Sequence, residues 1–316
     1  MTTTSVQGHS RAPAVVIIFA LIIAGGILYY FVDQLGGDVG TKAAQASSPT
    51  AVAIHEAAMS GDLKGVLAKI QSKTPVDVPY EGSEKWREGM TPLMSAAVAG
   101  KSDIVKALLG EKANVDATAR DGKTALIYAA GWGDASTVEA LLAAQARVDA
   151  RSNDGWTAVM MAAARGTPQS VRALVQKGAN VNVKNKWGQS PLVIASRTGE
   201  LDKVRVLLDA GANVNDRDQT GTTALGMAAA AESGLDVMKA LIEAKADVNQ
   251  ADNDGITPLM KAADRGDKDK VILLLNHGAR PELKDSSGKT ALDWARGRDD
   301  DAGRAVAALL SEAKGS

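Results

Sequence analysis

The 316-residue sequence has no cysteine, only three histidines and only two phenylalanines, and aromatic residues make up 3% of it. Without cysteine the chain forms no disulfides and has no thiolate metal site or cysteine nucleophile. With Phe19 and Phe31 as the only phenylalanines, few bulky side chains are available to fill one large globular core. Alanine and leucine suit thin stacked layers, so the composition favours a layered architecture.

Groups that carry chemistry are equally scarce. His9, His55 and His277 are not spaced like metal ligands or like a nucleophile and its base. The segment 131–133, Gly-Trp-Gly, lacks the third glycine of a dinucleotide-binding pattern. The formal charge of −1 argues against a broad nucleic-acid footprint, which needs a basic face. We predict no catalytic residues, metal, cofactor, nucleic-acid partner or small-molecule substrate, and we interpret the acidic run 299–301 as solvated surface.

The sequence is dominated by a repeated unit of 33 residues. A glycine recurs with spacings of 33, 33, 33, 33, 34 and 33, at Gly89, Gly122, Gly155, Gly188, Gly221, Gly255 and Gly288. Two residues after each glycine comes a small hydroxyl residue, at Thr91, Thr124, Thr157, Ser190, Thr223, Thr257 and Thr290. A period this regular indicates a stacked array of like units.

Each unit predicts two helices. A hydroxyl residue followed by proline marks the start of the first helix, because the hydroxyl caps free amides and proline needs no donor there; this occurs at 91–92, 190–191 and 257–258. The first helix is expected to end in a left-handed residue at Gly100, Gly133, Gly166, Gly199 and Gly266. A second, more apolar helix follows, as at 104–109. A polar turn such as 180–188, which we call a finger, leads into the next unit.

The pattern G-x-T-P-L-x-x-A-A-x-x-G, then I/V-x-x-L-L, then G-A-x-V-N, resembles the ankyrin repeat. Six units from 119 to 316 follow it with one inserted residue around 232–234, the unit at 86–118 fits after its finger, and 53–61 is a degenerate first unit. The resemblance implies an all-α solenoid of helix-turn-helix units with hairpin fingers, about eight repeats including caps, over residues 51–316. The position that is usually histidine in the family holds Met94, Ile127, Met160, Val193, Gly226, Met260 and Asp293, so apolar packing is expected to replace a polar contact.

The amino-terminal region lacks the repeat and contains a long apolar run. Residues 14–32 carry no charge over 19 positions and are rich in Val, Ile, Leu and Phe, which predicts one transmembrane helix with Tyr29 and Tyr30 near an interface. The alternatives are a buried helix of a soluble domain and a cleaved signal peptide, whose best cleavage site, Ala44-Gln45-Ala46, lies some twelve residues past the apolar run. We favour an uncleaved signal anchor, with residues 33–50 as a flexible linker.

The orientation of the span rests on few charges. Arg11 precedes it, whereas Asp33 and Asp38 come before the first lysine that follows it, Lys42. The positive-inside rule places the tail 1–13 in the cytoplasm and the repeats on the other side of the membrane. We therefore expect a single-pass protein of a bacterial inner membrane with a periplasmic repeat domain.

One finger is longer than the others. Asp77 and Gly89 are twelve positions apart, where the matching residues of later units are six apart. The insert includes Pro79, Tyr80, Glu81 and Trp86, and insertions in repeat arrays gather on one face, often the binding face. Two interpretations are open: Trp86 contacts a partner, or the loop covers the first repeat and buries Trp86.

The remaining candidate contacts lie on the fingers and near the ends of first helices. In ankyrin proteins these positions line a concave groove, and here they hold Trp156 and Trp187 on adjacent fingers, and Tyr128, Trp132, Met161, Arg165, Arg197, Lys261 and Arg265 on first helices. Tryptophan, tyrosine and arginine are favoured at binding hot spots because they combine large area with oriented hydrogen bonds. The alternative for each tryptophan is packing on a neighbouring finger.

We interpret the chain as a membrane-anchored module that binds a protein partner through this groove. It is either a free adaptor for a soluble periplasmic partner or an accessory subunit of an integral membrane complex; an enzyme is the third and weakest reading. The turns after the second helices add a local expectation. Gly178, Gly211 and Gly278 suit a left-handed turn, but the equivalent positions Lys112, Gln145 and Lys245 would be strained there.

Overall fold

The computed structural model divides the chain into two units, Met1–Gln45 and Ala46–Ser316, and describes residues 49–313. The predicted span at 14–32, the tail before it and most of the linker lie outside the described residues. Within 49–313 no helix combines the length and the apolar character needed to cross a membrane. The rest of this section concerns these residues.

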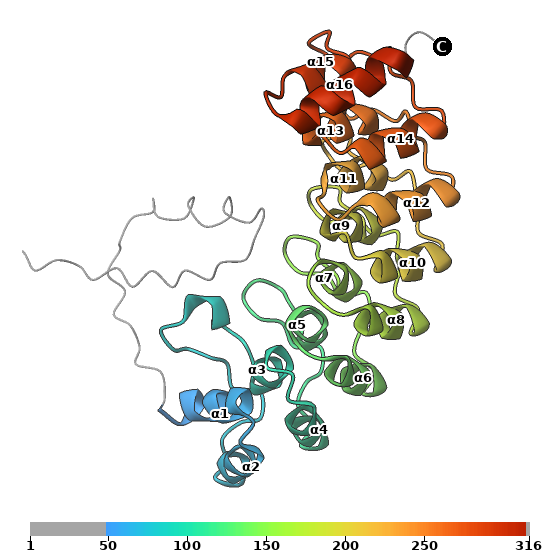
Figure 1. Cartoon of the computed structure of the whole chain (residues 1–316). Coiled ribbons are helices and arrows are strands. Elements are labelled where there is room, and N and C mark those ends of the chain that lie inside the picture. Colours follow the sequence, from blue (N-terminus) through green and yellow to red (C-terminus); the bar gives the residue numbers. More distant parts are fainter. Residues whose placement is uncertain (1–48, 314–316) are drawn as a thin grey trace, which may run out of the picture. The chain divides into compact units, whose positions relative to one another are not determined.

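Residues 49–313 form sixteen α-helices arranged as eight pairs (Figure 1). The first helices are α1 Pro49–Ser60, α3 Pro92–Val98, α5 Ala125–Trp132, α7 Ala158–Ala164, α9 Pro191–Thr198, α11 Ala224–Ala230, α13 Pro258–Arg265 and α15 Ala291–Arg296. The second helices are α2 Leu63–Gln71, α4 Ser102–Gly110, α6 Ala135–Ala143, α8 Pro168–Gln176, α10 Leu201–Asp209, α12 Leu235–Glu243, α14 Lys268–Asn276 and α16 Asp301–Ala313.

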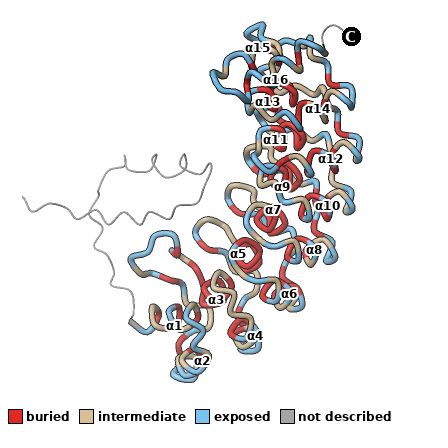
Figure 2. Tube along the Cα trace, in the orientation of Figure 1, coloured by how far each residue is buried: buried red, intermediate tan, exposed pale blue. Residues whose placement is uncertain are grey.

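The helices stand in two rows. First helices pack against first helices of neighbouring units, second helices against second helices, and each pair packs internally. Across the whole array of residues 49–313 the two rows of helices curve, and the first helices and the fingers lie on the inner side of the curve in Figure 1. Figure 2 shows the buried segments where helices of neighbouring units face one another. The all-α solenoid predicted from the repeat is therefore present, with its core made of thin layers of alanine, leucine and valine.

Hydroxyl caps start the first helices as predicted. Thr91, Ser190 and Thr257 each accept a hydrogen bond from the backbone amide three residues on, and proline occupies the first turn. At the position where histidine is usual, Met94 and Met260 are buried and place their sulfur 3.4 Å from the capping residue's amide. Each sulfur accepts a hydrogen bond from that amide, so the expectation that packing alone replaces the polar contact is wrong in these two units. In the last unit Asp293 accepts the corresponding hydrogen bond from the amide of Thr290 at 2.9 Å.

Backbone hydrogen bonds join each finger to the next. In each of them a finger amide donates to a carbonyl oxygen of the preceding finger over 2.8 to 3.3 Å. The pairs are Arg120 to Glu88, Asn153 to Asp121, Lys186 to Asp154, Gln219 to Trp187, Asn253 to Thr220 and Ser286 to Asp254. The hairpin character of the fingers reduces to isolated bridges at Thr118–Thr124 and Arg217–Thr223, because each finger is too short for a strand.

A second ladder runs through the turns that follow the second helices. Here a carboxylate or amide oxygen accepts a hydrogen bond from a backbone amide of the next unit over 2.8 to 3.1 Å. The acceptors are Asp77, Asp116, Asp149, Asn182, Asn215 and Asn249, and the donors are Asn114, Arg147, Asn180, Asn213, Asp247 and Arg280. The two ladders fix neighbouring units at both the finger and the opposite turn.

Two of the glycines that end first helices differ from the prediction. Gly100, Gly199 and Gly266 are left-handed, but Gly133 and Gly166 are not. A side chain at Gly133 would lie 2.6 Å from the carbonyl oxygen of Ala97, and one at Gly166 would lie 2.1 Å from that of Ala130. Glycine is required at these two positions by the close approach of neighbouring units, not by backbone conformation.

In two of the units whose first helix ends in a left-handed glycine, Gly199 and Gly266, a buried lysine follows four residues later. Lys203 and Lys270 are fully buried, and each ammonium group reaches a carbonyl oxygen near the end of the preceding first helix, that of Ala163 or Ala231. Each also pairs with the acidic residue three positions earlier, Lys203 with Glu200 at 2.9 Å. The lysines thus satisfy helix-end carbonyls in the neighbouring unit.

The turn after the second helix is left-handed whether or not glycine is present. Lys112, Gln145 and Lys245 have φ of 66°, 63° and 69°, close to the values of the glycines in equivalent turns, as the sequence indicated. Side chains other than glycine are strained in this region by about 1 kcal/mol.

We expect Gln145→Gly to raise the melting temperature, since it relieves that strain by about 1 kcal/mol in a turn whose conformation is already set. Thermal unfolding followed by circular dichroism measures the change. The reverse variant, Gly178→Gln, should lower the melting temperature by a similar amount. An unchanged or lower melting temperature for Gln145→Gly would show that the side chain makes a stabilising contact that offsets the strain.

Candidate functional site

The structure separates the ten predicted contact residues by exposure. Trp86 and Trp132 are the large apolar side chains most open to solvent among the described residues, at 54% and 43% exposed. Three arginines are also exposed, Arg165, Arg197 and Arg265. Three residues are half-buried, Trp156, Trp187 and Lys261. The buried residues are Tyr128 and Met161.

Tyr128 and Met161 were predicted to face the groove, and their burial corrects that expectation. Met161 packs into the space that Gly131 of the preceding unit leaves open, since a side chain on Gly131 would lie 2.5 Å from Met161 Cγ. Tyr128 turns toward its own finger, where its hydroxyl lies 3.1 Å from Asp121 Oδ2. Both residues support the surface from beneath and do not form it.

Tyr128 belongs to a strip of contacts that leads to an exposed tryptophan. Lys123 Nζ lies 5.5 Å from the Tyr128 ring, the Tyr128 and Trp132 rings are 6.2 Å apart, and the Arg165 guanidinium lies 5.2 Å from the Trp132 ring. These contacts join the finger of one unit, helix α5 and the end of helix α7. Trp132 is therefore held in place by its neighbours while much of its surface stays open.

Trp156 and Trp187 form a second aromatic contact, between adjacent fingers. Their rings meet edge to face, with centroids 6.4 Å apart and planes at 68°, an arrangement that aromatic pairs favour. Lys186, which the sequence argument did not select, lies 4.6 Å from the Trp187 ring and pairs with Asp154. The only sequence feature that could have indicated a role for Lys186 is its position next to Trp187 on a finger. Each ring packs on the neighbouring finger, as one interpretation had it, and each is still half exposed, so that a partner can also contact it.

Two of the predicted cationic residues are already neutralised. Lys261 Nζ lies 2.8 Å from Asp252 Oδ2, and Arg265 lies 3.5 Å from Glu232. Arg165 and Arg197, by contrast, have no carboxylate of residues 49–313 within ion-pair distance, although both are exposed. We define the groove surface as Trp132, Trp156, Arg165, Trp187 and Arg197.

The long finger is anchored by residues other than Trp86. Arg87, within the 3₁₀ turn η1 Lys85–Arg87, is buried, pairs with Glu56 at 2.6 Å and lies over the ring of buried Tyr80 at 4.1 Å. These contacts tie the finger to helix α1 and leave Trp86 in solvent. The reading in which the loop buries Trp86 is therefore wrong, and the reading in which Trp86 is available to a partner remains a prediction.

His55 fastens the same finger from inside. It is fully buried, with Nδ1 2.8 Å from Ser95 Oγ and Nε2 2.9 Å from the carbonyl oxygen of Val78. Burial lowers the pKa of His55 to about 4, although the hydrogen bond to Val78 opposes the shift. The imidazole is therefore neutral in the folded protein at neutral pH.

The pKa of His55 predicts a stability that falls in acid. Between pH 6.5 and about 4 the unfolded chain binds a proton at His55 that the folded chain does not, so the free energy of unfolding decreases as pH falls, by about 3 kcal/mol in total. Chemical denaturation of wild type and His55→Gln at several pH values measures this. The variant should be less stable at pH 7 but lose less stability on acidification. Equal losses in the two proteins would contradict the assignment.

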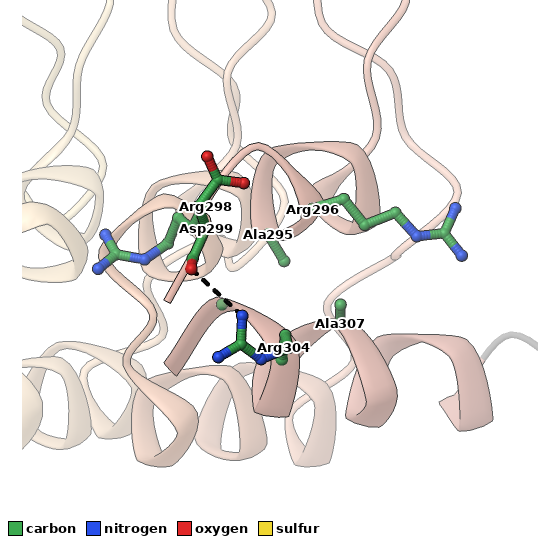
Figure 3. A pocket seen from close by; sticks show the side chains of 7 residues that line it. Ala295, Arg296, Arg298, Asp299, Arg304 and Ala307 are labelled. Carbon is green, nitrogen blue, oxygen red and sulfur yellow. Dashed lines mark hydrogen bonds between the residues drawn. The ribbon is translucent and has the colours of Figure 1, made fainter. Parts of the chain in front are cut away.

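The last unit contains a shallow pocket lined mainly by arginines and alanines. It measures about 230 Å³ and is lined by Arg296, Arg298, Asp299 and Arg304 among others (Figure 3). Arg298 hydrogen-bonds Asp300 and the carbonyl oxygen of Asp264, while Arg304 hydrogen-bonds Asp301 and the carbonyl oxygen of Asp299. The hydrogen bond from Arg298 lowers the pKa of Asp300. The acidic run thus pairs with arginines as part of the end cap.

A curved stack of helix pairs linked by fingers defines a repeat solenoid, a class whose long surface binds other macromolecules. The family model described as "Ankyrin repeats (3 copies)" matches residues 54–154, 133–218, 159–252 and 225–314, which together cover 54–314. The chain belongs to the ankyrin repeat family. Members of this family are protein–protein interaction modules and are typically not enzymes.

A curated relative shares only part of a repeat region. The E3 ubiquitin-protein ligase hecd-1 of Caenorhabditis elegans is 55% identical over 49 residues, which is 16% of this chain and 2% of that protein. A match of this length concerns the repeat itself. It carries no activity or partner over to this chain.

Proposed function

We propose that this protein is a membrane-anchored adaptor that binds a partner protein on the groove surface, with its repeats in the periplasm of a bacterium. Family membership supports the binding role. The uncharged run at 14–32 supports the anchor, and Arg11 before it, with Asp33 after it, supports the orientation. The observation that carries the location of the binding surface is Trp132, 43% exposed yet held between Tyr128 and Arg165.

An exposed tryptophan held in place is suited to binding. Large aromatic side chains contribute most when they are buried by a partner, and a ring already fixed by its neighbours loses little conformational freedom on binding. Trp156 and Trp187 are fixed in the same way by their edge-to-face contact. The three tryptophans come from three consecutive units, so one extended segment or one protein surface contacts all of them.

We expect the double variant Trp156→Ala, Trp187→Ala to fold and to lose its partner. Affinity purification of the full-length protein from native membranes in mild detergent, followed by mass spectrometry, identifies the partner and measures its recovery. Because Trp156 also packs on the core, its loss can lower stability, so Trp132→Ala serves as a second variant that removes a more exposed ring.

A control variant on the other end of the chain tests whether the effect is local. Trp294→Phe changes a half-buried tryptophan of the last unit, whose Nε1 hydrogen-bonds Asp285, and should keep the partner. Full recovery of the partner by both folded groove variants would place the binding surface elsewhere, with the long finger and Trp86 as the next region to test.

The second candidate function is an accessory subunit of an integral membrane complex, which the predicted span itself favours. Purification of the full-length chain beside a chain lacking residues 1–32 separates the two. For an adaptor, we expect both chains to capture the same partner, since the groove is sufficient. Stoichiometric membrane proteins recovered only with the full-length chain would instead assign the span a role in assembly.

A further inference from the structure

We propose that the partner presents an acidic segment, whose carboxylates pair with Arg165 and Arg197 while neighbouring apolar side chains pack on Trp132, Trp156 and Trp187. This inference rests on the proposed function and specifies the chemistry of the partner at the same surface. The supporting observation is which charged side chains around the groove surface already have ion-pair partners within the chain.

The acidic side chains of the neighbouring fingers are already engaged within the chain. Asp121 pairs with Lys123 at 2.5 Å, Asp154 pairs with Lys186, and Asp216 pairs with Lys184 at 3.2 Å. Asp218 accepts hydrogen bonds from the amides of Thr220 and Thr222. Lysines therefore compensate the charges of Asp121, Asp154 and Asp216, while neutral donors hold the Asp218 carboxylate.

Arg165 and Arg197 are the two predicted contact cations without a carboxylate partner among residues 49–313, and the finger residues Arg151 and Arg217 hydrogen-bond only carbonyl and amide oxygens. They sit at the ends of α7 and α9, the first helices of consecutive units, and both side chains are exposed. The contact of Arg165 with the Trp132 ring fixes its guanidinium without neutralising its charge. The residual charge of the groove surface is therefore positive, and carboxylates of a partner would complement it in the planar, two-pronged geometry that guanidinium favours.

The same observations favour a protein segment over a nucleic acid. Nucleic-acid binding needs many cations that follow a phosphate backbone, whereas the fingers beside the groove surface carry carboxylates as well as cations. The formal charge of the whole chain is −1. The three tryptophans lie on consecutive units, Arg165 contacts the Trp132 ring, and Arg197 follows one unit later, so an extended segment with acidic residues flanking an apolar one would contact both kinds of group.

The probe is a peptide selected from a random display library on the full-length protein in detergent. We expect the selected peptides to be enriched in aspartate and glutamate, and fluorescence anisotropy then measures their binding. Changing the acidic residues of a selected peptide to the corresponding amides should weaken binding by about tenfold or more, and so should the double variant Arg165→Gln, Arg197→Gln. Binding of the original peptide should also weaken as salt increases.

The chain offers a matched control. Arg172 and Arg205 are exposed arginines of α8 and α10, the second helices of the same two units. The variant Arg172→Gln, Arg205→Gln removes the same charge from the other row and should leave binding unchanged. Charge reversal, Arg165→Glu with Arg197→Glu, should bind a peptide in which lysines replace the acidic residues.

Three results would overturn the inference: no acidic enrichment, equal binding by the Arg165→Gln, Arg197→Gln variant, or displacement of the peptide by a single-stranded oligonucleotide. The tryptophan variants keep this failure distinct from failure of the proposed function. If Trp156→Ala, Trp187→Ala loses the peptide and the arginine variant does not, the groove binds protein but does not select acidic residues. If neither variant loses it, the groove is not the binding surface.

Discussion

The hydrogen bonds between successive units are the constraint on which the rest of the structure depends. One ladder joins backbone groups of adjacent fingers, and the other joins an Asp or Asn side chain to an amide of the next unit. A unit of 33 residues cannot bury its apolar face alone, so its stability comes from its neighbours. The two ladders fix the distance and rotation between units, and the apolar layers can then pack at only one register.

Because the array is fixed from within, the position at the end of the first helix can vary between units without changing the fold. Trp132 and Arg165 occupy the same position in consecutive units, where the next unit has Thr198. The repeat constrains that position little, since it lies at the end of the first helix, where Trp132 and Arg165 are exposed and Thr198 is half-buried. The ring of Trp132 adds exposed apolar area at this position, which is consistent with the proposed binding surface.

Buried polar side chains inside the stack also depend on groups of neighbouring units for their hydrogen bonds. Lys203 and Lys270 are buried because each reaches a carbonyl oxygen of the preceding unit. His55 is buried because its Nε2 donates to the carbonyl oxygen of Val78 and its Nδ1 hydrogen-bonds the Ser95 hydroxyl. In each case the partner lies 23 to 40 residues away along the chain. The first unit of the described residues is tied down by the long finger, in which Arg87 pairs with Glu56 and lies over the Tyr80 ring.

The sequence by itself determined the repeat, its two helices, the hydroxyl caps and the strained turns at Lys112, Gln145 and Lys245, because each depends on residues a few positions apart. Only the tertiary structure decided which of the predicted contacts are accessible. Tyr128 and Met161 are buried because the folded chain brings them against Asp121 and Gly131. Trp86 stays exposed because its neighbour Arg87 turns inward to pair with Glu56 of helix α1. Equivalent glycines such as Gly133 and Gly199 likewise differ in role, because the approach of the neighbouring unit decides whether space or backbone conformation requires glycine.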